Sequence, residues 1–411
     1  VSMLVKLLSP LALLALVALL AHPTHALVPN AVLLPKAFLL PIRRCFGLSG
    51  QHSAQIRMTS PSSSSSDASS TTIKDMMGSK VDCPQIGIGM AALGRPGYIS
   101  LTHKRDFEGV GKSVEAMQER AYAVLDSAYA AGVRYFDAAR SYGRAEEFLA
   151  AWLKDRGIAP GDVCVGSKWG YTYTANWQTD TGGQPHEVKE HSRENLEKQS
   201  KETEGLLGEY VNLYQIHSAT QASGVLTNES VIEGLWNIKK GKGWKIGLSL
   251  SGVEQAETLR MAIAVKNNEG ERLFDSVQAT YNVLESSCSE ALKEAKSAGM
   301  QVIVKEGMAN GRLFEDGNGG PSREKLSVLH AEARRLGCSV DSLGLACIIA
   351  QGFEPMVLSG AACKEHLESN MNAIRLVKEG KVTGEVAKRI IGGCRMAPEE
   401  YWAERSALEW Q

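Results

Sequence analysis

Short apolar runs alternate with longer amphipathic stretches from Cys83 onward. The short runs have the length of buried strands, and the longer stretches repeat their apolar residues with a helical period. This alternation is typical of β-α units around a parallel sheet. The expected strands are 84–89, 133–137, 163–168, 211–217, 245–249, 276–280, 301–305 and 356–358. The expected helices are 114–131, 144–156, 186–207, 230–240, 253–266, 289–298 and a pair within 322–352.

Eight strands, each followed by a helix, favour a closed (β/α)₈ TIM barrel within the α/β class. An open dinucleotide-binding sheet is the alternative, because Gly87-Ile-Gly89-Met-Ala-Ala92 matches the pattern G-x-G-x-x-[GA]. That pattern must open a helix, whereas Leu93-Gly-Arg-Pro-Gly97 follows here and cannot start a regular one. The sequence therefore predicts the barrel.

The first 80 residues have the character of a leader. Lys6 precedes an almost uninterrupted Leu/Ala/Val run, and a small-residue cleavage site ends at Ala26, which is the pattern of a signal peptide. Residues 27–66 then contain no acid, four basic residues and a serine run, as transit peptides do. Such a two-part leader predicts import into a plastid surrounded by extra membranes. Secretion, or a true start at Met58, remains open.

The resulting organisation is a signal peptide at 1–26, a disordered transit-like leader at 27–80, a barrel at 81–376 and a C-terminal helical extension at 377–411. No stable membrane span is expected in the mature protein. An apparent helix at 398–410 carries Tyr401, Trp402 and Trp410, which either pack on the barrel or cover its mouth.

Charge and cysteine usage exclude several classes of function. The 45 basic and 46 acidic side chains give a net charge of −1, which offers no attraction for nucleic acid. The eight cysteines form no Cys-x-x-Cys pair, so we expect neither a zinc site nor a disulfide framework. A small ligand in a local pocket fits this composition best.

Four polar residues fall where a barrel concentrates its chemistry. Asp137, Lys168 and His217 end three expected strands, and Tyr142 follows the first of them. Strand ends converge on one mouth, so these side chains are expected to meet there. Each alone also has a structural explanation, as a helix cap, an edge charge, a satisfied histidine or a packed ring.

Together the four residues, in their local strings, resemble the catalytic tetrad of the aldo-keto reductase family. The strings are Tyr135-Phe-Asp137-Ala-Ala-Arg-Ser-Tyr142-Gly, Val165-Gly-Ser-Lys168 and Leu213-Tyr-Gln-Ile-His217-Ser, and the resemblance spans about 83–373. It implies reduction of an aldehyde or ketone by NADPH, or the reverse oxidation, with NADH as the alternative cofactor. Tyr142 would donate the proton, Lys168 would favour the phenolate, Asp137 would hold Lys168, and His217 would orient the carbonyl oxygen.

The same resemblance implies a set of cofactor-binding residues. They are Ser249, Gln278, Lys305, Asn310, Gly311, Gly360, Lys364, His366 and Asn370. Three positions depart from the family pattern. Leu250 replaces an asparagine, Lys305 stands where a tyrosine often stacks on the nicotinamide, and His366 stands where an arginine often binds the 2′-phosphate. Lys364 is a possible substitute, because a lysine binds phosphate as a point charge.

The substrate is less constrained. The ring-rich segment 169–177 after the Lys168 strand could wall a substrate pocket or merely cover the barrel rim. A nicotinamide-binding sensor subunit with little turnover and a non-catalytic structural barrel are the alternative functions. The identity of the carbonyl compound and the oligomeric state are open.

Overall fold

The computed structural model describes residues 72–73, 76–78, 82–101, 103–107, 109, 111–314 and 325–411. The predicted signal peptide and most of the transit-like leader lie outside these residues and stay predictions.

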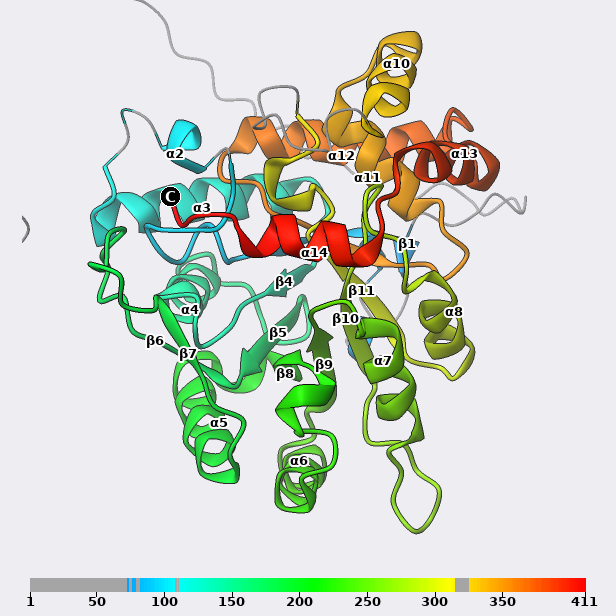
Figure 1. Ribbon diagram of the computed structural model, residues 1–411. Coiled ribbons are helices and arrows are strands. Elements are labelled where there is room, and N and C mark those ends of the chain that lie inside the picture. The colour runs from blue at the N-terminus through cyan, green and yellow to red at the C-terminus, as the bar shows by residue number, and fades with distance from the viewer. Residues whose placement is uncertain are drawn as a thin grey trace, which may run out of the picture. The chain divides into compact units, whose positions relative to one another are not determined.

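Eight parallel strands close into a barrel in the order β10-β11-β12-β3-β4-β5-β8-β9 (Figure 1). All eight expected strands are confirmed, as is the TIM barrel. Their bounds are β3 (Ile86–Gly89), β4 (Tyr135–Asp137), β5 (Cys164–Trp169), β8 (Val211–Ala219), β9 (Lys245–Leu250), β10 (Ser276–Thr280), β11 (Gln301–Lys305) and β12 (Met356–Ser359).

Helices surround the barrel, and several begin at a side-chain cap. Ser113, Asn228 and Ser339 each accept a hydrogen bond from a backbone N–H of the first helical turn. The helices are α2 (His103–Asp106), α3 (Val114–Ala130), α4 (Ala145–Asp155), α5 (Arg193–Leu207), α6 (Glu229–Lys242), α7 (Gln255–Ala264), α8 (Ser289–Ser297), α10 (Ser327–Leu336), α11 (Val340–Ile349), α12 (Lys364–Lys378), α13 (Gly384–Cys394) and α14 (Pro398–Ser406). Short 3₁₀ turns are η1 (Met76–Gly78), η2 (Gly208–Tyr210), η3 (Gln221–Ser223) and η4 (Ala309–Gly311).

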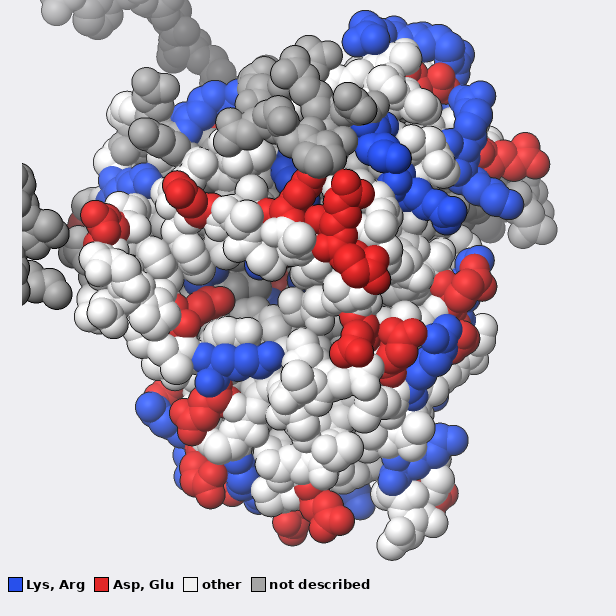
Figure 2. Space-filling view, viewed as in Figure 1, with Lys and Arg blue, Asp and Glu red and all other residues white. Residues whose placement is uncertain are grey.

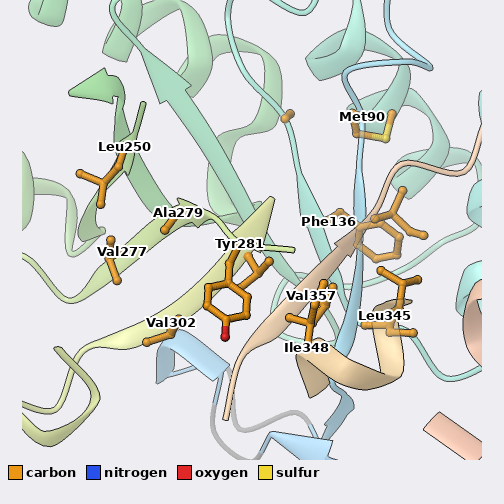
Figure 3. Packing of buried hydrophobic residues seen from close by; sticks show 14 of the residues in the cluster. Met90, Phe136, Leu250, Val277, Ala279, Tyr281, Val302, Leu345, Ile348 and Val357 are labelled. Atoms are coloured by element: carbon orange, nitrogen blue, oxygen red, sulfur yellow. The ribbon is translucent and has the colours of Figure 1, made fainter. Parts of the chain in front are cut away.

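The main core lies between the strands and the helices. Figure 3 shows Val357 of β12 close to Leu345 and Ile348 of α11. In β4, Phe136 faces this layer and packs on Trp152 of α4, with ring centroids 5.3 Å apart. Because side chains alternate along a strand, Asp137 faces the barrel interior instead. The core thus sets the direction of the acidic side chain.

Two helix predictions were wrong at their ends. The helix expected over 186–207 begins at Arg193, because Ser192 caps it by accepting from the N–H of Asn195. The preceding residues form β7 (Glu187–Lys189), paired antiparallel with β6 (Tyr171–Tyr173). The middle of the ring-rich segment, Tyr171–Tyr173, is therefore one strand of a hairpin arm. The helix expected over 398–410 ends at Ser406.

The packed part of the chain begins before residue 81. β1 (Thr72–Ile73) pairs with β2 (Cys83–Pro84), and Met76 is fully buried against residues near the starts of the barrel strands, including Tyr135 and Met356. The predicted leader of 27–80 thus includes residues that close the bottom of the barrel.

The predicted extension 377–411 contains α13 and α14, and α12 continues past the predicted boundary at 376. In Figure 1, α14 (red) lies across the barrel. Among the described residues, no helix combines the length and the apolar character that a membrane span needs.

Candidate active site

A cavity of about 370 Å³ opens at the C-terminal ends of the barrel strands. Figure 2 shows the hollow on the face that α14 crosses. Ten of the sequence-predicted site residues line it: Asp137, Tyr142, His217, Gln278, Lys305, Asn310, Gly311, Gly360, His366 and Asn370. The convergence expected from the strand ends is therefore present.

Lys168 and Asp137 form a buried ion pair at the base of this cavity. The Lys168 ammonium also donates to the carbonyl of Ala138 at 2.9 Å. The second oxygen of Asp137, Oδ1, accepts from the Tyr135 hydroxyl at 3.1 Å and from the side-chain amides of Gln215 and Gln278 at 3.1 and 3.0 Å. Both carboxylate oxygens are thus bonded, which fixes the carboxylate and, through it, the ammonium.

Tyr142 presents its hydroxyl to two of the predicted partners. The oxygen lies 3.4 Å from Lys168 Nζ and 3.5 Å from His217 Nε2. Burial raises the pKa of the phenol, and the nearby carboxylate of Asp137 raises it further, whereas the guanidinium of Arg95 opposes them. The phenol is therefore protonated near neutrality, the state that a proton donor requires.

His217 is neutral at physiological pH. Burial lowers its pKa well below the usual range, and the positive charges of Lys168 and Lys305 add to this. Its Nδ1 lies 3.5 Å from the hydroxyl of Ser141, and its Nε2 faces Tyr142. When Ser141 donates to Nδ1, the imidazole proton is on Nε2 and points toward the cavity.

The carboxylate of Asp137 stabilises the charged form of Lys168, which burial disfavours. Burial lowers the pKa of the ammonium, and the carboxylate of Asp137 acts in the opposite direction. A cation placed this close to a phenol stabilises the phenolate form that remains after proton transfer.

The loop after β11 has strained backbone on the cavity wall. Glu306, Ala309 and Asn310 all have left-handed φ values, of 55°, 49° and 59°, and such residues cluster at functional sites. Asn310 donates from Nδ2 to the carbonyl of Ile99 at 3.0 Å, but its buried Oδ1 has no partner. A buried acceptor on a cavity wall is a place for a ligand's N–H or O–H group.

Two predicted cofactor residues do not line the cavity. Ser249 accepts from the backbone N–H of Ser218 at 2.9 Å, and so fixes the irregular last residues of β8. Lys364 is 62% exposed and lies 3.8 Å from Glu365. Asn370 does line the cavity, but its amide is used within the fold, accepting from Ser359 at 2.7 Å and donating to Asp341 at 2.8 Å.

Sequence reasoning missed several residues that contribute charged or polar groups to the cavity, among them Arg95, Tyr98, Arg105, Asp106, Glu187, Glu306 and Arg405. Arg95 and Tyr98 lie in the loop after β3, Glu187 on the hairpin arm, and Arg405 on α14. None of them ends a predicted strand, although Glu306 directly follows the expected strand 301–305. Of the segment 169–177, no residue lines the cavity.

Glu306 joins α14 to the barrel. Its carboxylate accepts from Arg405 at 2.9 Å and from the hydroxyl of Thr280 at 3.1 Å, and Lys305 lies 3.9 Å away. Burial alone would raise the pKa of Glu306, but the charges of Lys305 and Arg405 outweigh it and lower the pKa to about 2.

Acid is therefore expected to remove a stabilising contribution of Glu306. The folded pKa lies below the unfolded value of about 4.3, so the contribution is present above about pH 4 and is lost as the pH falls toward 2. It amounts to about 3 kcal/mol. The free energy of unfolding of the parent should thus exceed that of Glu306→Gln near pH 6, with the gap closing toward pH 3. A gap that stays constant over this range would contradict the assignment.

Comparison with known proteins places this geometry in a family. The model of the aldo/keto reductase family matches residues 86–388. The aldo-keto reductase str7 of Strobilurus tenacellus is 27% identical over 323 residues, covering 72% of this chain and 86% of that protein. The structure of aldo-keto reductase AKR11C1 from Bacillus halodurans superposes with a TM-score of 0.57 at 18% identity, covering 80% of this chain and 97% of that one. An aldo-keto reductase from Klebsiella pneumoniae, solved with NADPH, gives a TM-score of 0.54 at 18% identity, covering 78% and 93%. The chain therefore belongs to the aldo/keto reductase family, whose members are NAD(P)-dependent oxidoreductases that act on carbonyls and alcohols.

Proposed function

We propose that the chain reduces an aldehyde or ketone with NADPH, or catalyses the reverse oxidation, and that Tyr142 is the proton donor. The observation that carries this proposal is the position of the Tyr142 hydroxyl, on the cavity wall within 3.5 Å of both Lys168 Nζ and His217 Nε2. When bound, the reduced nicotinamide supplies a hydride to the carbonyl carbon, so that negative charge develops on the carbonyl oxygen.

Each residue of the tetrad has a distinct part in handling that charge. Tyr142 donates its proton to the oxygen, and the ammonium of Lys168 stabilises the phenolate that is left. The neutral imidazole of His217 donates a hydrogen bond from Nε2 to the same oxygen and so sets its orientation. Asp137 keeps Lys168 charged and in place. In the reverse direction, the phenolate of Tyr142 accepts the alcohol proton.

The cavity wall fits a nicotinamide cofactor at several points. The unpartnered Oδ1 of Asn310 can accept a hydrogen bond from a ligand. A side chain added at Gly360 would meet no neighbouring atom, so the wall is open there. Gln278 lines the cavity beside Asp137 and Lys305. The NADPH in the Klebsiella pneumoniae relative supports the same class of ligand.

The choice of NADPH over NADH rests on two basic side chains at one end of the cavity. His366 and Arg105 line it there, together with the carboxylate of Asp106, which lies 3.8 Å from His366 Nε2. Lys364 is directed to solvent and is not part of this wall. We therefore assign the 2′-phosphate contact to His366 and Arg105.

His366→Arg is expected to tighten NADPH binding about tenfold and to leave NADH binding unchanged, because a guanidinium binds a phosphate through two parallel hydrogen bonds. Dissociation constants from fluorescence titration of the two reduced cofactors would measure this. Lys364→Ala is the matched control and should change neither constant by more than about twofold. Equal tightening of both cofactors by His366→Arg would contradict the phosphate assignment.

The proposed reaction is tested by following the absorbance of NADPH and NADH with the purified protein and a panel of aliphatic aldehydes, aromatic aldehydes, ketones and sugar carbonyls. Sustained oxidation of NADPH with any panel member supports it. Tight cofactor binding without turnover on the whole panel would instead identify a nicotinamide-binding sensor.

A further inference from the structure

Arg95 lies against the catalytic turn because two loops meet without intervening side chains. A side chain at Gly143 would place its Cβ 2.5 Å from the carbonyl oxygen of Gly94 and 2.8 Å from the Cβ of Arg95. The N–H of Arg144 also donates to the Gly94 carbonyl at 2.7 Å. The loop after β3 is thus bonded directly to the turn that carries Tyr142.

The side chain of Arg95 is buried, and its guanidinium contacts three parts of the site. Its Nη1 donates to the carbonyl of Ser141 and to the carboxylate of Glu187, both at 2.8 Å. Its Cζ lies 5.1 Å from the centroid of the Tyr142 ring and 4.7 Å from that of Trp410. One side chain therefore connects the catalytic turn, the hairpin arm and the C-terminal tail.

Two cations border the ring of Tyr142. Lys168 Nζ lies 4.7 Å from its centroid, and Arg95 is the second cation. The charge of Lys168 is matched by the buried carboxylate of Asp137. The charge of Arg95 is matched by Glu187, whose side chain is 22% exposed and therefore better screened by water. The guanidinium is consequently the less compensated of the two charges at the phenol.

We propose that Arg95 is a positioning residue for Tyr142, one that holds its ring and, with Glu187 as counter-charge, sets the ease with which the phenol gives up its proton. This inference rests on the proposed function, in which Tyr142 is the donor. It adds a fifth side chain, from the loop after β3, to the three at strand ends and to Tyr142 in the turn after β4.

The two charges act on Tyr142 in opposite directions. Arg95 lowers the pKa of the phenol, and Glu187 raises it. In the pH profile of kcat for carbonyl reduction, Arg95→Gln should therefore move the fall at high pH (the high-pH limb) to a pH about one unit higher. Glu187→Gln should move the same limb to a lower pH, by less than one unit. Arg95→Lys keeps the positive charge but lacks the planar guanidinium. Its high-pH limb should therefore lie close to that of the parent.

A merely structural role would not give shifts of opposite sign, because both substitutions break the same ion pair. NADPH dissociation constants within about twofold of the parent would confirm that the cofactor site is intact in each variant. Limbs that coincide with the parent, or that move in the same direction in Arg95→Gln and Glu187→Gln, would overturn the proposal.

A direct titration of residue 142 separates this inference from the proposed function. A fluorinated tyrosine, whose phenol is more acidic, is placed at 142 and followed by fluorine NMR in the parent, Arg95→Gln and Glu187→Gln backgrounds. We expect the midpoint to be highest in Arg95→Gln and lowest in Glu187→Gln. Absence of turnover in the parent refutes the proposed reaction, whereas equal midpoints refute the role of Arg95.

Discussion

Tyr142→Phe is expected to lower kcat for carbonyl reduction by about a thousandfold, the usual contribution of a positioned general acid. The substitution removes an oxygen that lies within 3.5 Å of both Lys168 Nζ and His217 Nε2. The ring remains, so its packing on His217, with centroids 5.4 Å apart, is retained. Steady-state rates at saturating cofactor and substrate would measure the loss, and NADPH binding should stay within about twofold.

Tyr122→Phe is the matched control. It also removes a phenolic oxygen, but from a tyrosine that does not line the cavity. The hydroxyl of Tyr122 donates to Asp155 at 2.9 Å and so joins α3 to α4. We expect Tyr122→Phe to retain the rate of the parent. A Tyr142→Phe variant as active as this control would show that the proton reaches the carbonyl oxygen from another group and would remove the central role that we assign to the phenol.

The meeting of Asp137, Lys168 and His217 was predictable from the sequence because barrel geometry places strand ends together, and Tyr142 lies in the turn after the first of these strands. Asp137 pairs in register with Gly166, and Lys168 pairs with Gln215, so the strands that carry Asp137, Lys168 and His217 are direct neighbours. Alternation along each strand then turns these side chains inward. Both facts follow from the strand pattern and need no knowledge of side-chain packing.

The charged residues around the tetrad were not predictable in this way. The position of Arg95 beside Tyr142 depends on the close approach of Gly94 and Gly143. These two residues lie in separate loops, and the sequence alone does not show that the loops meet. Glu187 was assigned to a helix because the amphipathic pattern of α5 runs back through it, whereas pairing with Tyr173 makes it a strand residue. Arg405 reaches the cavity from an element almost a hundred residues beyond Glu306, at a position fixed by tertiary contacts.

The dependence on tertiary contacts also explains why two of the predicted cofactor residues, Ser249 and Lys364, do not line the cavity. Ser249 lies near the end of β9, as expected, but a hydroxyl there can also bond to the neighbouring strand, and here it accepts from the backbone N–H of Ser218 in β8. Lys364 and His366 are two residues apart on α12, so they lie on different sides of the helix, and His366 alone of the two lines the cavity. Proximity in sequence therefore does not select the residue that faces the ligand.

Breaking the buried Lys168–Asp137 pair is expected to be the most destabilising change at the site. Asp137→Asn leaves a buried ammonium with the Ala138 carbonyl and the Tyr142 hydroxyl as its remaining partners, and should lower the free energy of unfolding by about 3 to 5 kcal/mol. Lys168→Met leaves a carboxylate that still accepts three hydrogen bonds on Oδ1, so its cost should be smaller, about 2 kcal/mol. Urea titrations near pH 7 would rank the two variants.

Two measurements distinguish the loss of the ion pair from general damage to the fold: the pH dependence of the free energy of unfolding of Asp137→Asn, and the stability of its double variant with Lys168→Met. Without Asp137, the folded pKa of Lys168 falls further below the unfolded value of about 10, so the unfolded state binds more protons and stability rises with pH. The deficit of Asp137→Asn should therefore shrink between pH 7 and pH 10. Combining Asp137→Asn with Lys168→Met removes both charges and should restore stability to within about 1 kcal/mol of Lys168→Met, yet leave turnover at least a hundredfold below the parent. Costs that simply add in the double variant would mean that the two charges do not depend on each other for their place in the fold.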